Sequence, residues 1–162
     1  MAAEYGRRPT GGPARRWDRW AGGQTRPVPA CVIVDGNNVI GAVPDGWWRD
    51  RPAAARRLLG RLQCLVGAED LAVVLVLDVA DPTMPEGDHG GVDVRYARRR
   101  GRDAADDRIR ELVAERAGGA ERRAEPLTVI TSDRALADDV RAAAVDVIGA
   151  TAFLGRLDER GC

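Results

Sequence analysis

The feature that most constrains the fold of this chain is a repeated pattern of short apolar runs that each lead into an acidic residue. Residues 31–35 read Cys-Val-Ile-Val-Asp, and residues 71–78 form a second apolar run that also ends in Asp. A third run, at residues 127–131, is followed directly by a Ser-Asp pair at 132–133. Such β-branched runs are typical of strands buried on both faces of a parallel sheet. Because ligands of open α/β sheets bind beyond the carboxyl ends of the strands, the pattern predicts a carboxylate-lined site there.

Helical patterns alternate with these strands. A helix is expected from Pro52 to about Val66, because proline suits a first helical turn and the leucines that follow recur at helical spacing. Two more helices are expected after Asp103 and Ser132, both good N-caps, and a short closing helix is expected with Thr151 as its cap. Strands that alternate with helices predict an α/β fold, a three-layer sandwich around a central parallel sheet.

Two further strands complete the expected sheet. Residues 92–96 alternate apolar and polar side chains, which predicts a more exposed strand at an edge of the sheet. A final strand is expected at 145–149. The Pro, Gly and acidic residues at 81–91 predict a loop.

The chain of 162 residues suits one domain, expected at residues 31–157. Residues 1–30 are rich in Gly, Pro and Arg without apolar periodicity and are expected to be a flexible basic segment, and residues 158–162 a tail. The formal net charge is zero, so overall charge gives no reason to expect a nucleic-acid or membrane partner. No apolar run suits a membrane span or a signal peptide, and a cytoplasmic location is therefore expected.

Two absences in the composition exclude whole classes of chemistry. The chain contains no Lys, so a Walker-type phosphate loop and Schiff-base catalysis are both excluded. The three cysteines have no metal-ligand spacing. Cys31 and Cys64 are expected to be buried thiols, as in a reducing compartment.

Four acids are candidates for one metal site. Asp35, Asp78 and Asp133 lie at strand ends, and Asp106 lies one turn into the helix expected after Asp103. Clustered carboxylates repel one another unless a cation lies between them, and their hard oxygen ligands suit Mg²⁺ or Mn²⁺. Such an ion polarises a phosphoryl oxygen and lowers the pKa of an attacking water.

Structural roles are the alternative for several of these residues. For Asp103 and Ser132, helix capping alone is the favoured role. Asp78 and Asp133 could cap a turn or lie in a first helical turn. Asp35 differs, because no helix is expected next to it and an acid at a buried strand end needs a partner.

The chain resembles the NYN-domain proteins of the PIN-like nuclease superfamily, above all the bacterial branch of RNA-binding PIN-like proteins. The resemblance covers about residues 31–155. The motifs that carry it, in the family's order, are Asp35-Gly36-Asn37-Asn38-Val39-Ile40, the strand end at Asp78, Ala105-Asp106-Asp107-Arg108-Ile109, and Thr131-Ser132-Asp133.

The resemblance implies a PIN-like fold with parallel strands in the order 3-2-1-4-5, and RNA cleavage that depends on Mg²⁺ or Mn²⁺ with water as nucleophile. Matched by motif, the implied metal ligands are Asp35, Asp78, Asp106 and Asp133. Asn38 joins Asp35, Asp106 and Asp133 as an implied catalytic residue. The chain departs from the pattern at Asn37, where many relatives have an aromatic residue, and the helix expected at 53–66 lacks an acid found in some PIN nucleases.

Substrate contacts are expected from residues beside the acids. An arginine-rich run leads directly into the Asp106 region, and its guanidinium groups would neutralise phosphates. An aromatic side chain in that run would stack on an unpaired base. The Trp47–Trp48 pair is expected instead to pack against the core. The residues assigned to substrate binding are Asn37, Ser132, Tyr96, Arg98, Arg99, Arg100 and Arg102.

Three functions remain open on the sequence. The leading one is a metal-dependent ribonuclease, and the second is a non-catalytic RNA- or nucleotide-binding module on the same fold. A phosphatase of the haloacid-dehalogenase kind is disfavoured, because Asn37 stands where that class has a second Asp and its usual Lys is absent. RNA is the expected partner, and a second copy of the chain and the ribosome are further candidates.

Overall fold

The computed structural model describes residues 30–101, 103–117 and 126–162. The segment predicted to be flexible at residues 1–30 therefore lies almost entirely outside the described residues. In chain order, the elements are β1 (Ala30–Asp35), α1 (Gly36–Gly41), the 3₁₀ helix η1 (Trp47–Arg49), α2 (Arg51–Ala68), β2 (Leu71–Leu77), β3 (Gly87–His89), β4 (Val92–Tyr96), α3 (Ala104–Ala117), β5 (Leu127–Ile130), α4 (Arg134–Ala142), β6 (Asp146–Ile148) and α5 (Ala150–Glu159).

The strands form one sheet in the order β3-β4-β2-β1-β5-β6. Five of them, β4, β2, β1, β5 and β6, are parallel, and counted along the chain they have the predicted order 3-2-1-4-5. The sixth, β3, pairs antiparallel with β4 and forms the edge. The α/β class is confirmed, and the sheet is mixed rather than wholly parallel.

Two expectations near this edge are wrong. The strand at residues 92–96 is not an edge strand, because β3 covers it, and the supposed loop at 81–91 contains β3. The segment Gly87-Asp88-His89 has no apolar pattern of its own, so its strand conformation comes from pairing with β4.

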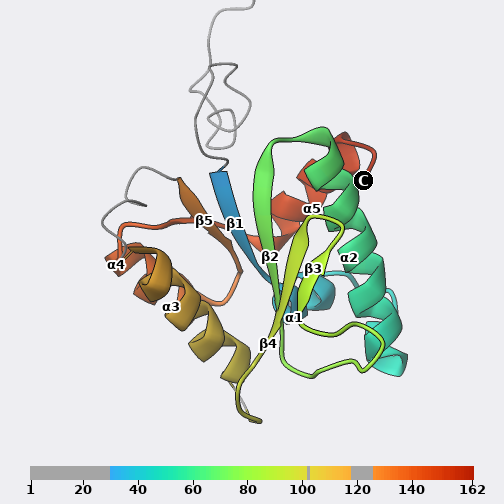
Figure 1. Ribbon diagram of the computed structural model, residues 1–162, viewed down its shortest axis with the longest axis horizontal. Helices are drawn as coiled ribbons and strands as arrows, with labels where there is room; N and C mark the ends of the chain where they lie inside the picture. Colours follow the sequence, from blue (N-terminus) through green and yellow to red (C-terminus); the bar gives the residue numbers. More distant parts are fainter. Residues whose placement is uncertain (1–29, 102, 118–125) are drawn as a thin grey trace, which may run out of the picture.

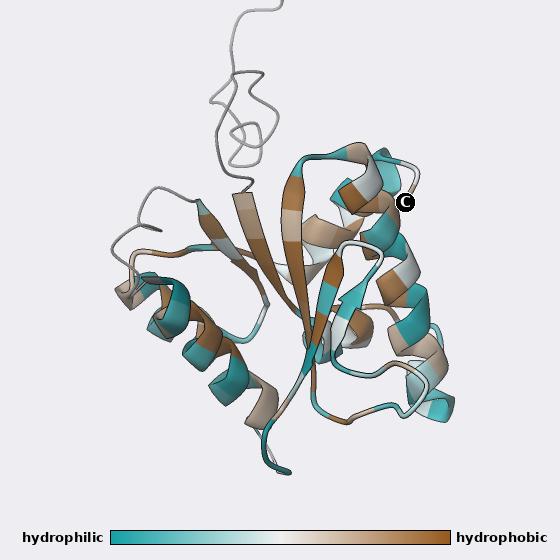
Figure 2. Cartoon of the chain, viewed as in Figure 1, coloured by the Kyte–Doolittle hydropathy of each residue, from teal (hydrophilic) through white to brown (hydrophobic). Residues whose placement is uncertain are grey.

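Helices cover both faces of the sheet, so the molecule has three layers (Figure 1). The helices α1, α2 and α5 pack on one face, and α3 and α4 pack on the other. Alternate side chains of β1 point to opposite faces of the sheet: Val32 and Val34 belong to one buried cluster, and Cys31 and Ile33 belong to the other. Figure 2 shows the central strands as the most hydrophobic part of the molecule.

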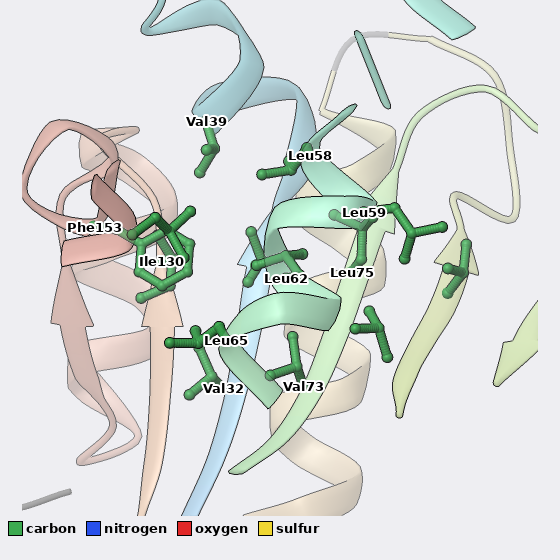
Figure 3. Close-up of a cluster of buried hydrophobic side chains, with 14 of the residues drawn as sticks. Val32, Val39, Leu58, Leu59, Leu62, Leu65, Val73, Leu75, Ile130 and Phe153 are labelled. Atoms are coloured by element: carbon green, nitrogen blue, oxygen red, sulfur yellow. The ribbon is translucent and has the colours of Figure 1, made fainter. Parts of the chain in front are cut away.

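The helix predicted to start near Pro52 is α2, the longest in the described chain. Asp50 is its N-cap and accepts a hydrogen bond from the Ala53 amide at 2.9 Å. Its leucines pack on the sheet beside Val32 and Val73 (Figure 3). The opposite side of α2 carries charged residues. Among the described helices, none is long and apolar enough to cross a membrane.

Two helix starts differ from the sequence prediction. Asp133, not Ser132, is the N-cap of α4 and accepts from the Leu136 amide at 2.9 Å. The N-cap position of α5 is Gly149, so Thr151 lies inside that helix. The hydroxyl of Ser132 accepts instead from the Ala150 amide at 2.9 Å, at the start of α5. A serine from another loop thus takes the capping role expected of Thr151.

The expectation that Cys64 is a buried thiol is wrong, because it forms a disulfide with Cys162. Cys31 is buried and free, as expected. Arg61 reinforces the link between α2 and the chain end, donating to the Cys162 carbonyl at 2.8 Å. The last residues therefore pack against α2 rather than extending away as a tail.

Candidate active site

Five carboxylates line one pocket at the carboxyl ends of the strands. The pocket has a volume of about 180 Å³ and lies where β1, β2 and β5 end and α3 begins. Figure 1 shows these strand ends at the lower end of the sheet. Side chains from segments far apart in the sequence thus meet here. The polar side chains that line it are Asp35, Asn37, Asn38, Asp78, Asp103, Asp106 and Asp133.

Asp35 is the most buried of these acids, with 3% of its surface exposed. Contrary to expectation, a helix does begin beside it: α1 starts at the next residue, and the Asp35 carboxylate accepts from the Asn38 amide at 3.2 Å. Its other oxygen accepts from the Thr131 hydroxyl at 2.9 Å. The acid therefore has two partners, and neither carries a positive charge.

Burial raises the pKa of Asp35 to about 6. The hydrogen bonds from Thr131 and Asn38 oppose this rise, and the negative charges of Asp106 and Asp78 add to it. Desolvation is the largest of these effects. The protein alone therefore does not fully compensate a negative charge on the Asp35 carboxylate.

Asn37 holds Asp78 in place through both ends of its amide. Its Nδ2 donates to the Asp78 carboxylate at 2.7 Å, and its Oδ1 accepts from the Asp78 backbone amide at 3.2 Å. This pair of hydrogen bonds ties the first turn of α1 to the end of β2. An aromatic side chain could not make it, which gives a physical reason for Asn at this position. The amide of Asn37 is therefore committed to positioning Asp78.

Asn38 connects the end of β1 to the Thr-Ser-Asp turn after β5. Its Oδ1 accepts from the Ser132 backbone amide at 2.8 Å. In the same turn, the Thr131 hydroxyl accepts from the Asp133 amide at 3.1 Å while it donates to Asp35. Thr131 was not among the predicted site residues, and its adjacency to Ser132 and Asp133 was the only sequence signal for it.

Asp106 and its neighbour Asp107 have opposite environments. Burial raises the pKa of Asp106, and the nearby Asp133 raises it further, against the opposing effect of Arg110. Asp107 faces away and pairs with Arg99 and Arg110, and the hydrogen bond from Arg99 is the main reason its pKa is lowered. Successive helix positions thus separate an acid of the pocket from an acid paired at the surface.

The donor chemistry of this pocket fits a hard divalent cation. Carboxylate and amide oxygens are the ligands that Mg²⁺ and Mn²⁺ prefer, and the raised pKa values of Asp35 and Asp106 mark charge that such an ion would neutralise. Within the described residues, no three His, Cys, Asp or Glu side chains are already arranged to hold an ion. The acids therefore share a pocket without forming a ready-made set of three ligands.

The arginines and the tyrosine that were predicted to bind substrate divide into three groups. Arg98 and Arg99 lie near the start of α3, where they pair with Glu111 at 3.2 Å and with Asp107. Arg100 is exposed, and Arg102 lies outside the described residues. The Tyr96 ring is buried and its hydroxyl donates to the Met84 carbonyl at 2.6 Å, so Tyr96 is not available to stack on a base.

The tryptophan pair does not pack into the core as predicted. Trp48 is 55% exposed, and Trp47 is half-buried with its ring edge-on to that of Trp48 at a centroid separation of 6.0 Å. The guanidinium of Arg51 lies 5.3 Å from the centroid of the Trp47 ring. An aromatic pair is normally assigned to the core on sequence alone, because nothing local marks it as exposed.

Comparisons with known proteins identify the fold. The family model described as the YacP-like NYN domain matches residues 32–161. Two solved structures of Rae1 (YacP) from Bacillus subtilis are similar. One has 23% identity, a TM-score of 0.65 and coverage of 81% of this chain and 75% of that one. The other, a W164L mutant, has 20% identity, a TM-score of 0.62 and coverage of 82% and 77%. No curated protein sequence matches the chain.

Proposed function

The chain belongs to the family of YacP-like NYN domains, within the nuclease-like PIN superfamily, and on that premise we propose that it is a metal-dependent ribonuclease. The observation that carries the proposal is the meeting of five carboxylates in one pocket around the buried Asp35. Repelling charges of this kind cost stability unless they serve to bind a cation. A pocket that only supported the fold would not need them.

In this proposal Asp35, Asp78, Asp106 and Asp133 hold Mg²⁺ or Mn²⁺. When bound, such an ion polarises a phosphoryl group and lowers the pKa of a water that attacks it. The remaining residues position these acids: Asn37 orients Asp78, and Thr131 orients Asp35.

Substrate is held by neutral and cationic donors around the acids. The Oδ1 of Asn38 accepts from the Ser132 amide, which leaves Nδ2 to donate to a phosphate oxygen of the substrate. Arg100 is exposed near the start of α3 and supplies positive charge for the flanking phosphates. Arg98 and Arg99 contribute less, since they already pair with Glu111 and Asp107.

The test combines metal binding with RNA cleavage. Calorimetry with Mn²⁺ on wild type and Asp35→Asn should show binding that the variant loses. Single-stranded and structured RNA should then be cut only by the wild type, and EDTA should stop the reaction. Asp138→Asn is the control, because this exposed acid on α4 pairs only with Arg141 within the described chain, at 3.2 Å. Cleavage by Asp35→Asn at the wild-type rate would reject the proposal.

A non-catalytic RNA-binding module is the second candidate. It is favoured by the absence, among the described residues, of a group already arranged to hold an ion. It predicts RNA affinity that falls steeply with salt but no cleavage products with Mg²⁺ or Mn²⁺. Specific products that disappear in Asp35→Asn would eliminate it. Homodimer formation, association with the ribosome and a cytoplasmic location stay predictions.

A further inference from the structure

A second, larger pocket adjoins the carboxylate pocket. Its volume is about 480 Å³, within the range of roughly 300–1,000 Å³ usual for small-molecule sites. It lies between α1, η1, the start of α2 and the chain after β2. Asn37 and Asp78 line both pockets, so a group that fills the larger one lies next to the acids.

The walls of this pocket are mostly apolar and include an aromatic ring. Trp47 lines it together with Ile40 and Val79. Val79 is 72% exposed, although it follows a buried strand. Trp48 does not line the pocket but contacts the Trp47 ring edge-on, which restrains the orientation of that ring. An exposed apolar surface beside a charged site has no evident role in folding and suits a planar, uncharged ligand group.

A positive charge lies at the same place. The Arg51 guanidinium is over the Trp47 ring, and within the described chain it forms no ion pair. Its neighbours on α2 differ, since Arg56 pairs with Asp81 at 2.7 Å and Arg57 with Asp45 at 3.2 Å. A stacked aromatic ring beside an uncompensated guanidinium is the combination that holds a nucleobase together with its phosphate.

We propose that this pocket binds one unpaired nucleotide of an RNA strand, with its base stacked on Trp47 and a phosphate paired with Arg51. The nucleotide would lie next to the phosphodiester bond that is cleaved at the carboxylate pocket. The inference rests on the proposed function and adds to it a binding site for one nucleotide, extruded from its neighbours in the strand. A duplex cannot place a base in such a pocket without unpairing it. The pocket therefore selects against double-stranded RNA.

The test is equilibrium binding of a short single-stranded RNA to the full chain in EDTA, so that no metal-dependent cleavage occurs. Wild type, Trp47→Leu, Trp47→Phe and Trp48→Leu are compared by fluorescence anisotropy, after thermal unfolding has verified that each is folded. We expect Trp47→Leu to weaken binding by about tenfold or more. Trp47→Phe keeps a stacking ring and should retain most of the affinity, and Trp48→Leu should have a smaller effect.

An abasic scan of the RNA provides the decisive arm. Removing the base that occupies the pocket should weaken binding to wild type but not to Trp47→Leu, because that variant has already lost the stacking partner. Equal losses for both proteins at every abasic position would overturn the pocket assignment. Cleavage that depends on Asp35 in the same preparation would then leave the nuclease proposal intact. If wild type bound no RNA, with or without Mn²⁺, both proposals would fall.

Discussion

At the scale of single residues, the site is defined by which acids have charged partners. Asp107 has two arginines, and its pKa is lowered. Asp35 has only a hydroxyl and a backbone amide, and its pKa is raised. Burial without a cationic partner therefore distinguishes Asp35 from Asp107.

Ionisation of Asp35 should destabilise the metal-free fold as pH rises. Between about pH 4 and pH 6 the folded state holds a proton that the unfolded chain has released, because the pKa is raised from 3.8 to about 6. Stability therefore falls with rising pH across this window, by at most about 3 kcal/mol. In urea unfolding with EDTA, the free energy of unfolding of Asp35→Asn should rise relative to that of wild type by roughly 2–3 kcal/mol between pH 4 and pH 7. Parallel pH curves for the two proteins would contradict the buried, uncompensated state of Asp35.

Replacing Thr131 should expose the role of its hydroxyl. Thr131→Val leaves the Asp35 oxygen and the Asp133 amide without their partner, which should cost about 1–3 kcal/mol of unfolding free energy. Thr131→Ser keeps the hydroxyl and is the matched control. Urea denaturation at pH 7 measures both. If serine and valine were equally destabilising, the loss would come from packing of the methyl group and not from the hydrogen bonds.

At the scale of elements, helix α1 was one feature that the sequence did not predict. Its first residues, Gly36-Asn37-Asn38, are poor helix formers. The helix is stabilised by the Asp35 cap and by tertiary contacts, including the clamp between Asn37 and Asp78. Local propensity could not reveal it, because those partners lie elsewhere in the chain.

Gly36 should tolerate no side chain, because α1 approaches β2 closely at that point. A Cβ at Gly36 would lie 2.6 Å from a Leu77 methyl carbon and 2.8 Å from the Val76 carbonyl oxygen. We expect Gly36→Ala to destabilise the fold by about 1–3 kcal/mol and to weaken Mn²⁺ binding, since α1 carries Asn37. Gly60→Ala is the control: that position, inside α2, has no atom within 4 Å of a new Cβ. It should stabilise the protein by about 0.5–1 kcal/mol.

At the scale of the whole molecule, the sequence predicted the central parallel strands and missed elements that depend on contacts between distant segments. The apolar runs at β1, β2 and β5 specified the sheet and brought Asp35 and Asp78 to one edge of it, because buried strands have a strong local signal. The strand β3 and the pairing of Cys64 with Cys162 have no such signal. Both depend on where distant segments meet, which only the assembled fold determines.

The disulfide should contribute to global stability. It joins residues 98 positions apart, so it restricts the unfolded chain over a long loop, and about 2–4 kcal/mol is expected from such a link. Cys162→Ser should be less stable than oxidised wild type by that amount in urea denaturation. Reduced wild type should match the variant, which separates the link from local packing at the chain end. Equal stability of the oxidised and reduced proteins would mean that the bond adds nothing.

Binding of Mn²⁺ should stabilise the whole molecule in a way that depends on the pocket acids. An ion that binds only the folded state adds about 2.7 kcal/mol when its concentration is one hundred times the dissociation constant. Wild type and Asp107→Asn should both gain this stability, since Asp107 faces away from the pocket and pairs with arginines. Asp106→Asn should lose most of the gain, because the adjacent acid lines the pocket. The three proteins are compared by thermal unfolding at pH 7 with Mn²⁺ and with EDTA. Equal gains in all three would locate the ion outside this pocket, whereas a loss confined to Asp106→Asn would identify it as the cation site without reference to any RNA substrate.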